Sequence, residues 1–460
     1  MKKDTAKISI TTQRHRYNLC FSQYIFTEIT IQRSKQYYLG RRFSLDSTFL
    51  LIGGSAVVIA FYVAWSIGAN DVANSMGTSV GSRAISLKQA ILIAGIFEFT
   101  GAVLIGIHVT KTIQNGIIDS ALFSVDPNIY AYGMLAALFA AAIWITVSTY
   151  FSLPISTSQS IVGALIGFGF IAIGPSAINW EKIIHIGESW VLSPITGMLL
   201  AFFIFYIIKK TIFDTEKPFE SAKRYLPFFA FVLLALISFS FFKSLEHTDF
   251  PQADFITVLW VTLTVGTISA IITYVFVGRY KPGDIKTDEE AYASIEHLFV
   301  YLQVITACFV AFAHGSNDVA NAIGPLAAVM NILNSGSIES ISGVPLWLVI
   351  LGGVGIVVGL ATWGYKVIGT IGKKITEVTP TRGFSAEFST ALVVLVCSRI
   401  GLPVSTSQVL VGSVIGIGFA KGIVAVDFKI IKRIMACWVI TVPVSAVTAA
   451  VIFITLRGLF

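Results

Sequence analysis

Uncharged apolar runs of about 19 residues or more recur along this 460-residue chain and constrain its fold more than any other feature. A run of that length crosses the hydrocarbon core of a bilayer as an α-helix. Lipid cannot pair backbone groups, so a crossing chain is either helical or a closed barrel. The alternating ten-residue segments of barrels are absent here. Only 12% of residues are charged, about half the share in soluble proteins. The sequence therefore predicts an all-α polytopic membrane protein.

The apolar runs predict about 12 transmembrane segments. They cover 48–67, 86–110, 129–151, 153–172, 183–208, 225–243, 254–277, 297–313, 345–371, 384–399, 403–419 and 433–457. Two pairs, 129–151 with 153–172 and 384–399 with 403–419, have almost no connecting residues. Each pair forms either two full crossings or a helical hairpin, with broken helices, that ends inside the membrane.

Lys and Arg are concentrated in four loops, which the crossing count places on one side of the membrane. These loops are 209–224, 278–296, 372–383 and 420–433. The positive-inside rule makes that side cytoplasmic and predicts a multi-pass protein of the plasma (inner) membrane. Both chain ends then lie outside. The N-terminal tail, 1–46, is basic and has no helical period, so we expect it to be disordered.

Two motifs occur twice in the same order. "SIGANDVANSMG" at Ser66 returns as "AHGSNDVANAIG" at Ala313, and "LPISTSQSIVGALIGFGF" at Leu153 returns as "LPVSTSQVLVGSVIGIGF" at Leu402. The offsets are nearly equal, 247 (313 − 66) and 249 (402 − 153). The chain is therefore a duplicated unit.

Seven segments precede the second copy, and because seven is odd the second copy enters the membrane from the opposite face. We expect a first transmembrane repeat at 47–210, a linker with two transmembrane helices at 211–296, and a second repeat at 297–460. Inverted repeats of this kind are typical of secondary transporters, which bind substrate at the midplane where the copies meet.

The Ser-Thr-Ser-Gln motifs have the composition of an anion site. Pro154 and Pro403 break the preceding segments, and Ser and Thr then begin new helices. Hydroxyls and free backbone N–H groups at a helix start, with its partial positive charge, bind anions. The alternative is that these residues only cap broken helices, and their recurrence in both copies favours binding.

The Asn-Asp motifs have the composition of a cation site. Carboxylate and amide oxygens, together with carbonyl oxygens of an unwound backbone, suit a hard cation such as Na⁺. A carboxylate inside a membrane is costly and therefore indicates function. The alternative is an acid at a loop-facing helix end that never enters the bilayer.

Three further ionisable residues lie in or beside apolar runs and have no counterpart in the other copy: Glu98, Glu387 and His314. Each could bind a coupling ion or proton, or could be a structural group hydrogen-bonded to its neighbours. No Lys or Arg lies in the middle of an expected span. An anion site without cationic side chains needs co-bound cations, which gives coupling a physical basis.

At these residues the sequence resembles the inorganic phosphate transporter (PiT) family of sodium- or proton-coupled symporters. The matching stretches are "GANDVANSMGTSVGSRAISLKQAILIAGIFEFTGAVLIG", "HGSNDVANAIGPLAAV", "GLATWGYKVIGTIGKKITEVTPTRGF" and "GLPVSTSQVLVGSVIGIG". The resemblance covers roughly 48–458. It implies twelve spans, inverted repeats, and phosphate bound between the two Ser/Thr hairpins.

The resemblance also implies site residues. For phosphate these are Ser156, Thr157, Ser158, Ser405, Thr406 and Ser407, to which we add the adjacent Gln159 and Gln408. For sodium they are Asn70, Asp71, Asn74, Asn317, Asp318 and Asn321. For coupling they are Glu98, Glu387 and His314.

The leading hypothesis is a symporter that imports inorganic phosphate with Na⁺ by alternating access. Many family members have Ser-Thr-Thr-His where this chain has Ser-Thr-Ser-Gln, and Gln cannot titrate, which favours Na⁺ over H⁺. H⁺ coupling, a sulfate permease and an anion channel remain as alternatives. No nucleophile–base pair, metal-ligand cluster or nucleotide loop is visible, so we expect no enzyme. We expect no cofactor besides the coupling ion and no nucleic-acid partner, and a homodimer is left open.

Overall fold

The computed structural model describes residues 47–245, 254–280, 287–335, 338, 344–368, 378–422 and 427–459. The chain divides into two units, Met1–Gly54 and Ser55–Phe460. Only the start of the first helix is described in the first unit, and the site discussed below lies in the second. The basic tail, 1–46, lies outside the described residues, so its expected disorder stays a prediction.

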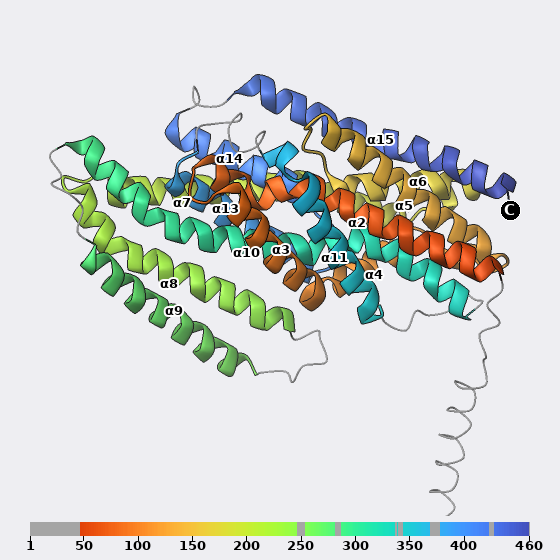
Figure 1. Ribbon diagram of the computed structural model, residues 1–460, viewed down its shortest axis with the longest axis horizontal. Coiled ribbons are helices and arrows are strands. Elements are labelled where there is room, and N and C mark those ends of the chain that lie inside the picture. Colours follow the sequence, from red (N-terminus) through yellow and green to blue (C-terminus); the bar gives the residue numbers. More distant parts are fainter. Residues whose placement is uncertain are drawn as a thin grey trace, which may run out of the picture. The chain divides into compact units, whose positions relative to one another are not determined.

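The first half of the chain is almost wholly helical (Figure 1). Its helices are α2 (Ser47–Gly81), α3 (Leu87–Ile105), α4 (Ile107–Asn115), α5 (Pro127–Tyr150), α6 (Thr157–Ala172) and α7 (Trp180–Ile208), with short turns η1 (Ser120–Phe123), η2 (Pro175–Ala177) and the π-helical η3 (Lys209–Phe213). Two long helices that pack along each other follow, α8 (Pro218–Leu245) and α9 (Phe255–Arg279).

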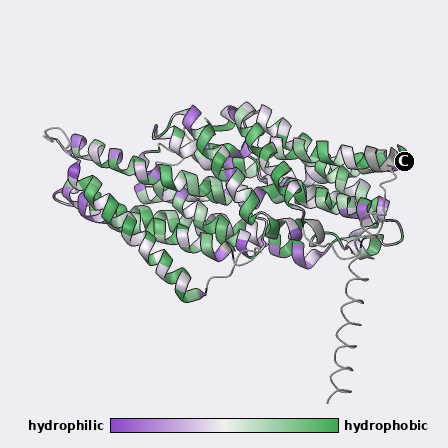
Figure 2. Cartoon of the chain, turned by 60° about the horizontal axis from the view of Figure 1, so that its bottom comes forward, coloured by the Kyte–Doolittle hydropathy of each residue, from purple (hydrophilic) through white to green (hydrophobic). Residues whose placement is uncertain are grey.

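The second half repeats this order. Its described helices are α10 (Asp288–Ser335), α11 (Leu346–Trp363), α13 (Pro380–Arg399), α14 (Thr406–Lys421) and α15 (Phe428–Leu459). Among the described residues, nine helices are long and apolar enough to cross a membrane. Hydrophobic residues make up most of the length of these helices, and hydrophilic residues are more frequent toward helix ends and connections (Figure 2). The molecule is therefore all-helical and polytopic, as expected.

Nine of the twelve expected spans are found among the described residues, and short helices account for two of the other three. The third, α13, has 20 residues but carries the charged residues Arg382, Glu387 and Arg399. α6 and α14 have 16 residues each. At 1.5 Å per residue each is about 24 Å long, less than the roughly 30 Å of the hydrocarbon core. The pairs α5–α6 and α13–α14 therefore fit the hairpin alternative better than two full crossings. The count of twelve stays a prediction.

The Asn-Asp motifs do not lie at helix breaks, and the expected unwound backbone was wrong. α2 has 35 residues and α10 has 48, and each passes through its motif as continuous helix. Asn and Asp favour helix ends when their side chains bond the local backbone. Here the motif side chains bond partners on other helices, so their own backbones stay helical. Cation ligands at these motifs must therefore come from side chains.

Close helix approaches at glycine show that the two copies pack alike. A Cβ at Gly68 of α2 would lie 2.0 Å from the carbonyl oxygen of Ile356 on α11. A Cβ at Gly315 of α10 would lie 2.0 Å from the carbonyl oxygen of Glu98 on α3. Only glycine permits either approach. Because Gly68 and Gly315 are the same motif position, Ile356 and Glu98 are structural counterparts.

The hairpins show a second such correspondence. Gly163 of α6 meets the backbone of Val442 on α15, and Gly412 of α14 meets the backbone of Pro194 on α7. α7 therefore packs along α14, and α15 along α6. The last helix of each copy is thus packed on the hairpin of the other copy.

Candidate functional site

The Asn-Asp helices are attached to the hairpin turns by the first Asn of each motif. The Asn70 amide donates to the hydroxyl of Thr149 at 2.9 Å and to the carbonyl of Leu153 at 3.1 Å. Its counterpart Asn317 donates to the carbonyl of Val404 at 2.8 Å. The first Asn thus holds each turn against its own motif helix. Their amide N–H groups thus stabilise the fold, and their expected part in binding sodium stays a prediction.

The two aspartates lie beside the first turns of the hairpin helices. The Thr157 hydroxyl donates to Asp71 Oδ2 at 2.9 Å, and the Thr406 hydroxyl lies 3.5 Å from Asp318 Oδ2. Both carboxylates are buried, at 2% and 1% exposure. The alternative of acids at loop-facing helix ends is therefore wrong. The structure places the predicted cation residues directly against the predicted anion residues.

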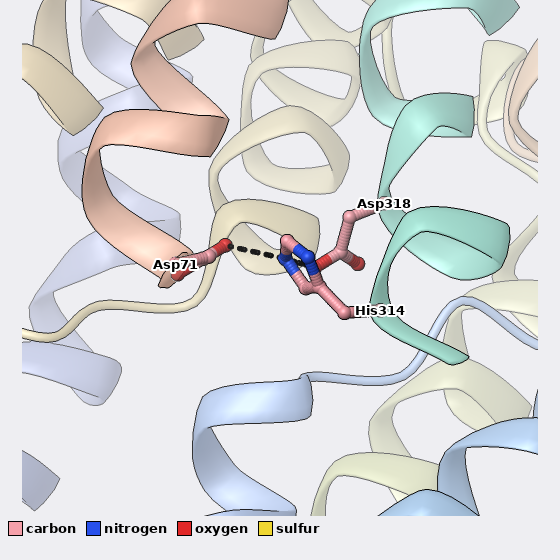
Figure 3. Close-up of side chains that lie close together, drawn as sticks. All are labelled: Asp71, His314 and Asp318. Atoms are coloured by element: carbon pink, nitrogen blue, oxygen red, sulfur yellow. Dashed lines mark ion pairs between the residues drawn. The ribbon is translucent and has the colours of Figure 1, made fainter. Parts of the chain in front are cut away.

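His314 lies between carboxylates from three helices. Figure 3 shows it between two of them, Asp71 and Asp318. Its Nε2 lies 2.8 Å from Asp318 Oδ2 and 3.8 Å from Asp71 Oδ2, and its Nδ1 lies 3.3 Å from Glu98 Oε1. Glu98 also accepts a hydrogen bond from the Ser75 hydroxyl at 2.9 Å. The structure therefore joins two of the predicted coupling residues to the predicted cation site.

The second Asn of each motif presents an unpaired oxygen. The Asn74 amide donates to Asp71 at 3.0 Å and the Asn321 amide donates to the Ser158 hydroxyl at 3.3 Å. Their Oδ1 atoms are buried and have no hydrogen-bond donor among the described residues. Amide and carboxylate oxygens are the ligands that hard cations prefer. Asn74 and Asn321, with Asp71 and Asp318, are therefore the side chains that fit a cation.

The two hairpin tips bind each other through a reciprocal pair of hydrogen bonds. The Ser158 hydroxyl donates to the Val404 carbonyl at 2.9 Å, and the Ser407 hydroxyl donates to the Ile155 carbonyl at the same distance. We call this pair the tip contact. It brings the starts of α6 and α14 together, as the sequence predicts for an anion site between them.

Each hairpin helix begins at a serine cap. The Ser156 hydroxyl accepts from the Gln159 N–H at 3.1 Å, and the Ser405 hydroxyl accepts from the Gln408 N–H at 3.3 Å. A helix leaves its first N–H groups without intrahelical partners. One cap bond per helix satisfies only one of them, so donors remain at both helix starts. The caps and the expected anion site are thus compatible uses of the same motif.

Glu387 is not part of this centre. It lies on α13, buried among donors from α2 and α10. These donors are the hydroxyls of Thr78 at 2.5 Å, Ser79 at 2.6 Å and Thr306 at 2.7 Å, and the amide of Gln303 at 3.5 Å. We call these five residues the Glu387 cluster. Both alternatives for Glu387 therefore stay open, because a hydrogen-bonded acid can also bind an ion.

Several residues of these contacts were missed by sequence reasoning. Ser75, Thr78, Ser79, Gln303 and Thr306 have no counterpart of the same type in the other copy, although Ser75 lies within the first Asn-Asp motif. Gln303 offered a signal, because it is an amide within an apolar run. The hydroxyls offered none, because Ser and Thr are common in helices of membrane proteins.

The chain matches the model of the phosphate transporter family over residues 67–449. A protein of Pyrococcus horikoshii named as a phosphate permease is 45% identical over 397 residues, covering 86% of this chain and 96% of that protein. The Arabidopsis thaliana inorganic phosphate transporter 2-1, chloroplastic, is 40% identical over 428 residues, which cover 88% of this chain and 72% of that protein.

A solved structure described as the sodium-dependent phosphate transporter matches with a TM-score of 0.81 and 39% identity, covering 90% of this chain and all of that one. These relatives are permeases and transporters, not enzymes. With the spans described above, the match identifies an integral, multi-pass membrane protein. The chain belongs to the phosphate transporter family.

Proposed function

We propose that this protein is a secondary symporter that imports inorganic phosphate together with Na⁺ by alternating access. One observation carries the proposal: two buried carboxylates and two unpaired amide oxygens lie against the starts of two facing helices. Cation ligands and anion donors therefore meet in one place. Each ion lowers the electrostatic cost of binding the other, and this linkage is reciprocal.

The cation half of the site rests on oxygen ligands. Asp71, Asn74, Asp318 and Asn321 supply side-chain oxygens from two helices, α2 and α10. The sodium dependence of the structural neighbour agrees with this choice of ion. Asn70 and Asn317 are left out of the ligand set, because their Oδ1 atoms already accept hydrogen bonds, from the Ile155 N–H and the Ser398 hydroxyl, at 3.4 Å each.

The anion half of the site rests on hydroxyls and helix starts. Ser and Thr of both motifs lie at the tip contact, where the partial positive ends of α6 and α14 meet. None of the hydrogen bonds described for these hydroxyls involves a Lys or Arg side chain, so positive charge would come from the cations. The tip contact would open when phosphate uses the same hydroxyls.

Alternating access follows from the repeats. Each hairpin packs against the last helix of the other copy, so the two copies present equivalent surfaces around one central site. Inverted copies that exchange conformations expose such a site first to one face and then to the other. Opening on one side of the tip contact and closing on the other would move both ions together.

Proton coupling is the second candidate, and one contact favours it. His314 lies within 3.8 Å of Asp71, Glu98 and Asp318. A protonated imidazole there would supply the positive charge that Na⁺ supplies in the leading proposal. The two candidates differ in which gradient drives uptake.

The test is uptake of radiolabelled phosphate into proteoliposomes under an imposed Na⁺ gradient, a pH gradient, or neither, with and without excess sulfate. Uptake that requires Na⁺ and survives sulfate supports the proposal. Uptake driven only by the pH gradient transfers the coupling to protons. Absence of phosphate uptake, or its abolition by sulfate, overturns the substrate.

A matched pair of variants locates the site in the same assay. Asn74→Ala and Asn321→Ala remove the two unpaired oxygens and should raise the Na⁺ concentration needed for half-maximal uptake. The exposed Asn128, which begins α5, serves as the control in Asn128→Ala. An unchanged Na⁺ requirement in both site variants would contradict the ligand assignment.

A further inference from the structure

A cavity of about 540 Å³ lies beside the hairpin starts, among α7, α14 and α15, with one residue of α6 in its wall. Its lining includes repeat-related pairs. Gln159 pairs with Gln408 at an offset of 249 (408 − 159), and Trp190 pairs with Trp438 at an offset of 248 (438 − 190). We call these the glutamine pair and the tryptophan pair. A cavity lined by both members of each pair lies on the axis that relates the two copies.

Four polar atoms of these pairs have no hydrogen-bond partner among the described residues. They are the Oε1 atoms of Gln159 and Gln408 and the indole Nε1 atoms of Trp190 and Trp438, all buried. The two glutamines are only 6% and 3% exposed. An unpaired buried polar group costs about 1–3 kcal/mol, and proteins rarely keep several together without use. The four atoms are two donors and two acceptors.

Dihydrogen phosphate has the complementary set of groups. Its two oxyanion oxygens accept hydrogen bonds, and its two P–O–H groups donate one each. Sulfate has the same shape and accepts in the same way, but at neutral pH it has no proton to donate. A buried carbonyl oxygen left facing a sulfate oxygen would be unpaired and repelled, and sites built to pair a substrate O–H reject analogues that lack it.

We propose that the tryptophan pair donates hydrogen bonds from its indole N–H groups to the oxyanion oxygens of phosphate and that the glutamine pair accepts hydrogen bonds from its P–O–H groups, which excludes sulfate. The inference rests on the proposed function and deepens it, because it assigns substrate selectivity to four residues. Both glutamines lie in the first turns of the hairpin helices, so the cavity adjoins the predicted anion site. The tryptophans are outside both recurring motifs.

The first test changes the donors. Trp190→Phe and Trp438→Phe keep an aromatic ring and remove the N–H group. Each variant should raise KM for phosphate about tenfold with little change in Vmax, which corresponds to about 1.4 kcal/mol. Trp260→Phe is the matched control, because Trp260 on α9 is 67% exposed and far from the cavity in the chain. Unchanged KM in both site variants overturns the donor role.

The second test changes the acceptors. Gln159→Met and Gln408→Met keep the length of the side chain and remove the amide. Sulfate should then inhibit phosphate uptake at concentrations that leave the unchanged protein unaffected. Equal sulfate tolerance in the unchanged protein and in both variants overturns the selectivity role. A variant that elutes as aggregate in detergent is replaced by Gln→Glu, which keeps an acceptor and should keep the rejection of sulfate.

The two proposals fail in different ways. If the unchanged protein takes up no phosphate, the proposed function is wrong and this inference goes with it. If the unchanged protein takes up phosphate, rejects sulfate, and all four variants behave like it, only this inference is wrong. Tryptophan fluorescence adds a readout independent of transport, because a phosphate-dependent change should shrink in each Trp→Phe variant and persist in Trp260→Phe.

Discussion

The two copies of the repeat have the same residues where their motif helices contact the hairpins, and different residues behind these contacts. Asp71 and Asp318 occupy equivalent positions against equivalent threonines. Behind them the second copy has His314 facing Glu98 across a helix contact. In the equivalent contact of the first copy, Ile67 and Ile356 stand in these places. An ionisable pair on one side is thus an aliphatic pair on the other.

Two residues of the Glu387 cluster also have apolar counterparts in the first copy. Shifting Glu387 back by the hairpin offset of 249 leads to Leu138, and shifting Thr306 back by the motif offset of 247 leads to Ile59. Leu138 is fully buried. Residues that both copies share suit a site that must open to two faces. Residues that only one side has can distinguish the faces, and so can give transport its direction.

The largest effect is expected from breaking the contact between His314 and Glu98. His314→Ile leaves the Glu98 carboxylate buried without its partner, and breaking a buried pair costs about 3–5 kcal/mol. The double variant His314→Ile/Glu98→Ile copies the aliphatic pair of the first copy and should recover the part of that stability that belongs to the Glu98 contact, since apolar replacement of both partners is often neutral. The contact of His314 with Asp318 stays lost in both variants. Denaturant unfolding in detergent measures both. A double variant less stable than the single one would show that the counterparts are not interchangeable.

The second largest effect is expected at Asp71 and Asp318, the carboxylates present in both copies. Asp71→Asn and Asp318→Asn keep shape and remove charge, and removing one partner of a buried charged contact costs about 2–5 kcal/mol. Na⁺-dependent phosphate uptake should fall about a hundredfold in each, equivalent to about 2.7 kcal/mol. Initial uptake rates in proteoliposomes provide the measurement, with the exposed Asp126→Asn as control. Loss in only one variant would mean that the two copies contribute unequally to the site.

A smaller effect is expected at the Glu387 cluster. Thr306→Val keeps the shape of the side chain and removes the hydroxyl that donates to Glu387 at 2.7 Å. A hydrogen bond to a charged group contributes about 1.5–3 kcal/mol, and three other donors remain to share the loss, so we expect about 1.5 kcal/mol. Thermal unfolding in detergent should show the decrease. Thr196→Val, on the exposed side of α7, should leave the unfolding temperature unchanged.

The smallest effect compares the two bonds of the tip contact. Ser158→Ala and Ser407→Ala each remove one hydroxyl that donates to a carbonyl of the opposite hairpin. Each should cost about 1 kcal/mol, and the two losses should be similar, because the tip bonds have equal length and each serine has one further polar partner, Asn321 for Ser158 and Ser405 for Ser407. Unfolding free energies measure this directly. A marked difference between the two would show that the hairpins are not equivalent in solution.

The repeats made most of the central site predictable from sequence. Asp71, Thr157 and their counterparts were found because a motif that occurs twice is hard to explain as packing alone. Glu98 and Glu387 were found because carboxylates are rare in apolar runs. The structure adds that Glu98 belongs with His314 and that Glu387 lies elsewhere, which depends on how distant helices pack.

Two features escaped prediction for different reasons. The continuous helices through the Asn-Asp motifs depend on tertiary partners such as Thr149 and Val404, which satisfy side chains that would otherwise compete with the helix. Trp190 and Trp438 carried a usable signal, because they recur at an offset of 248, close to the offsets of both motifs. A search for any recurring pair at that spacing would have found them.

The exchange of last helices between the copies has a consequence for how the protein is made. α6 packs along α15, which follows it by more than 250 residues in the sequence. During synthesis the first hairpin therefore enters the membrane before this partner helix has been made. A chain truncated before α15 would retain nearly every site residue and still lack the helix against which the first hairpin packs.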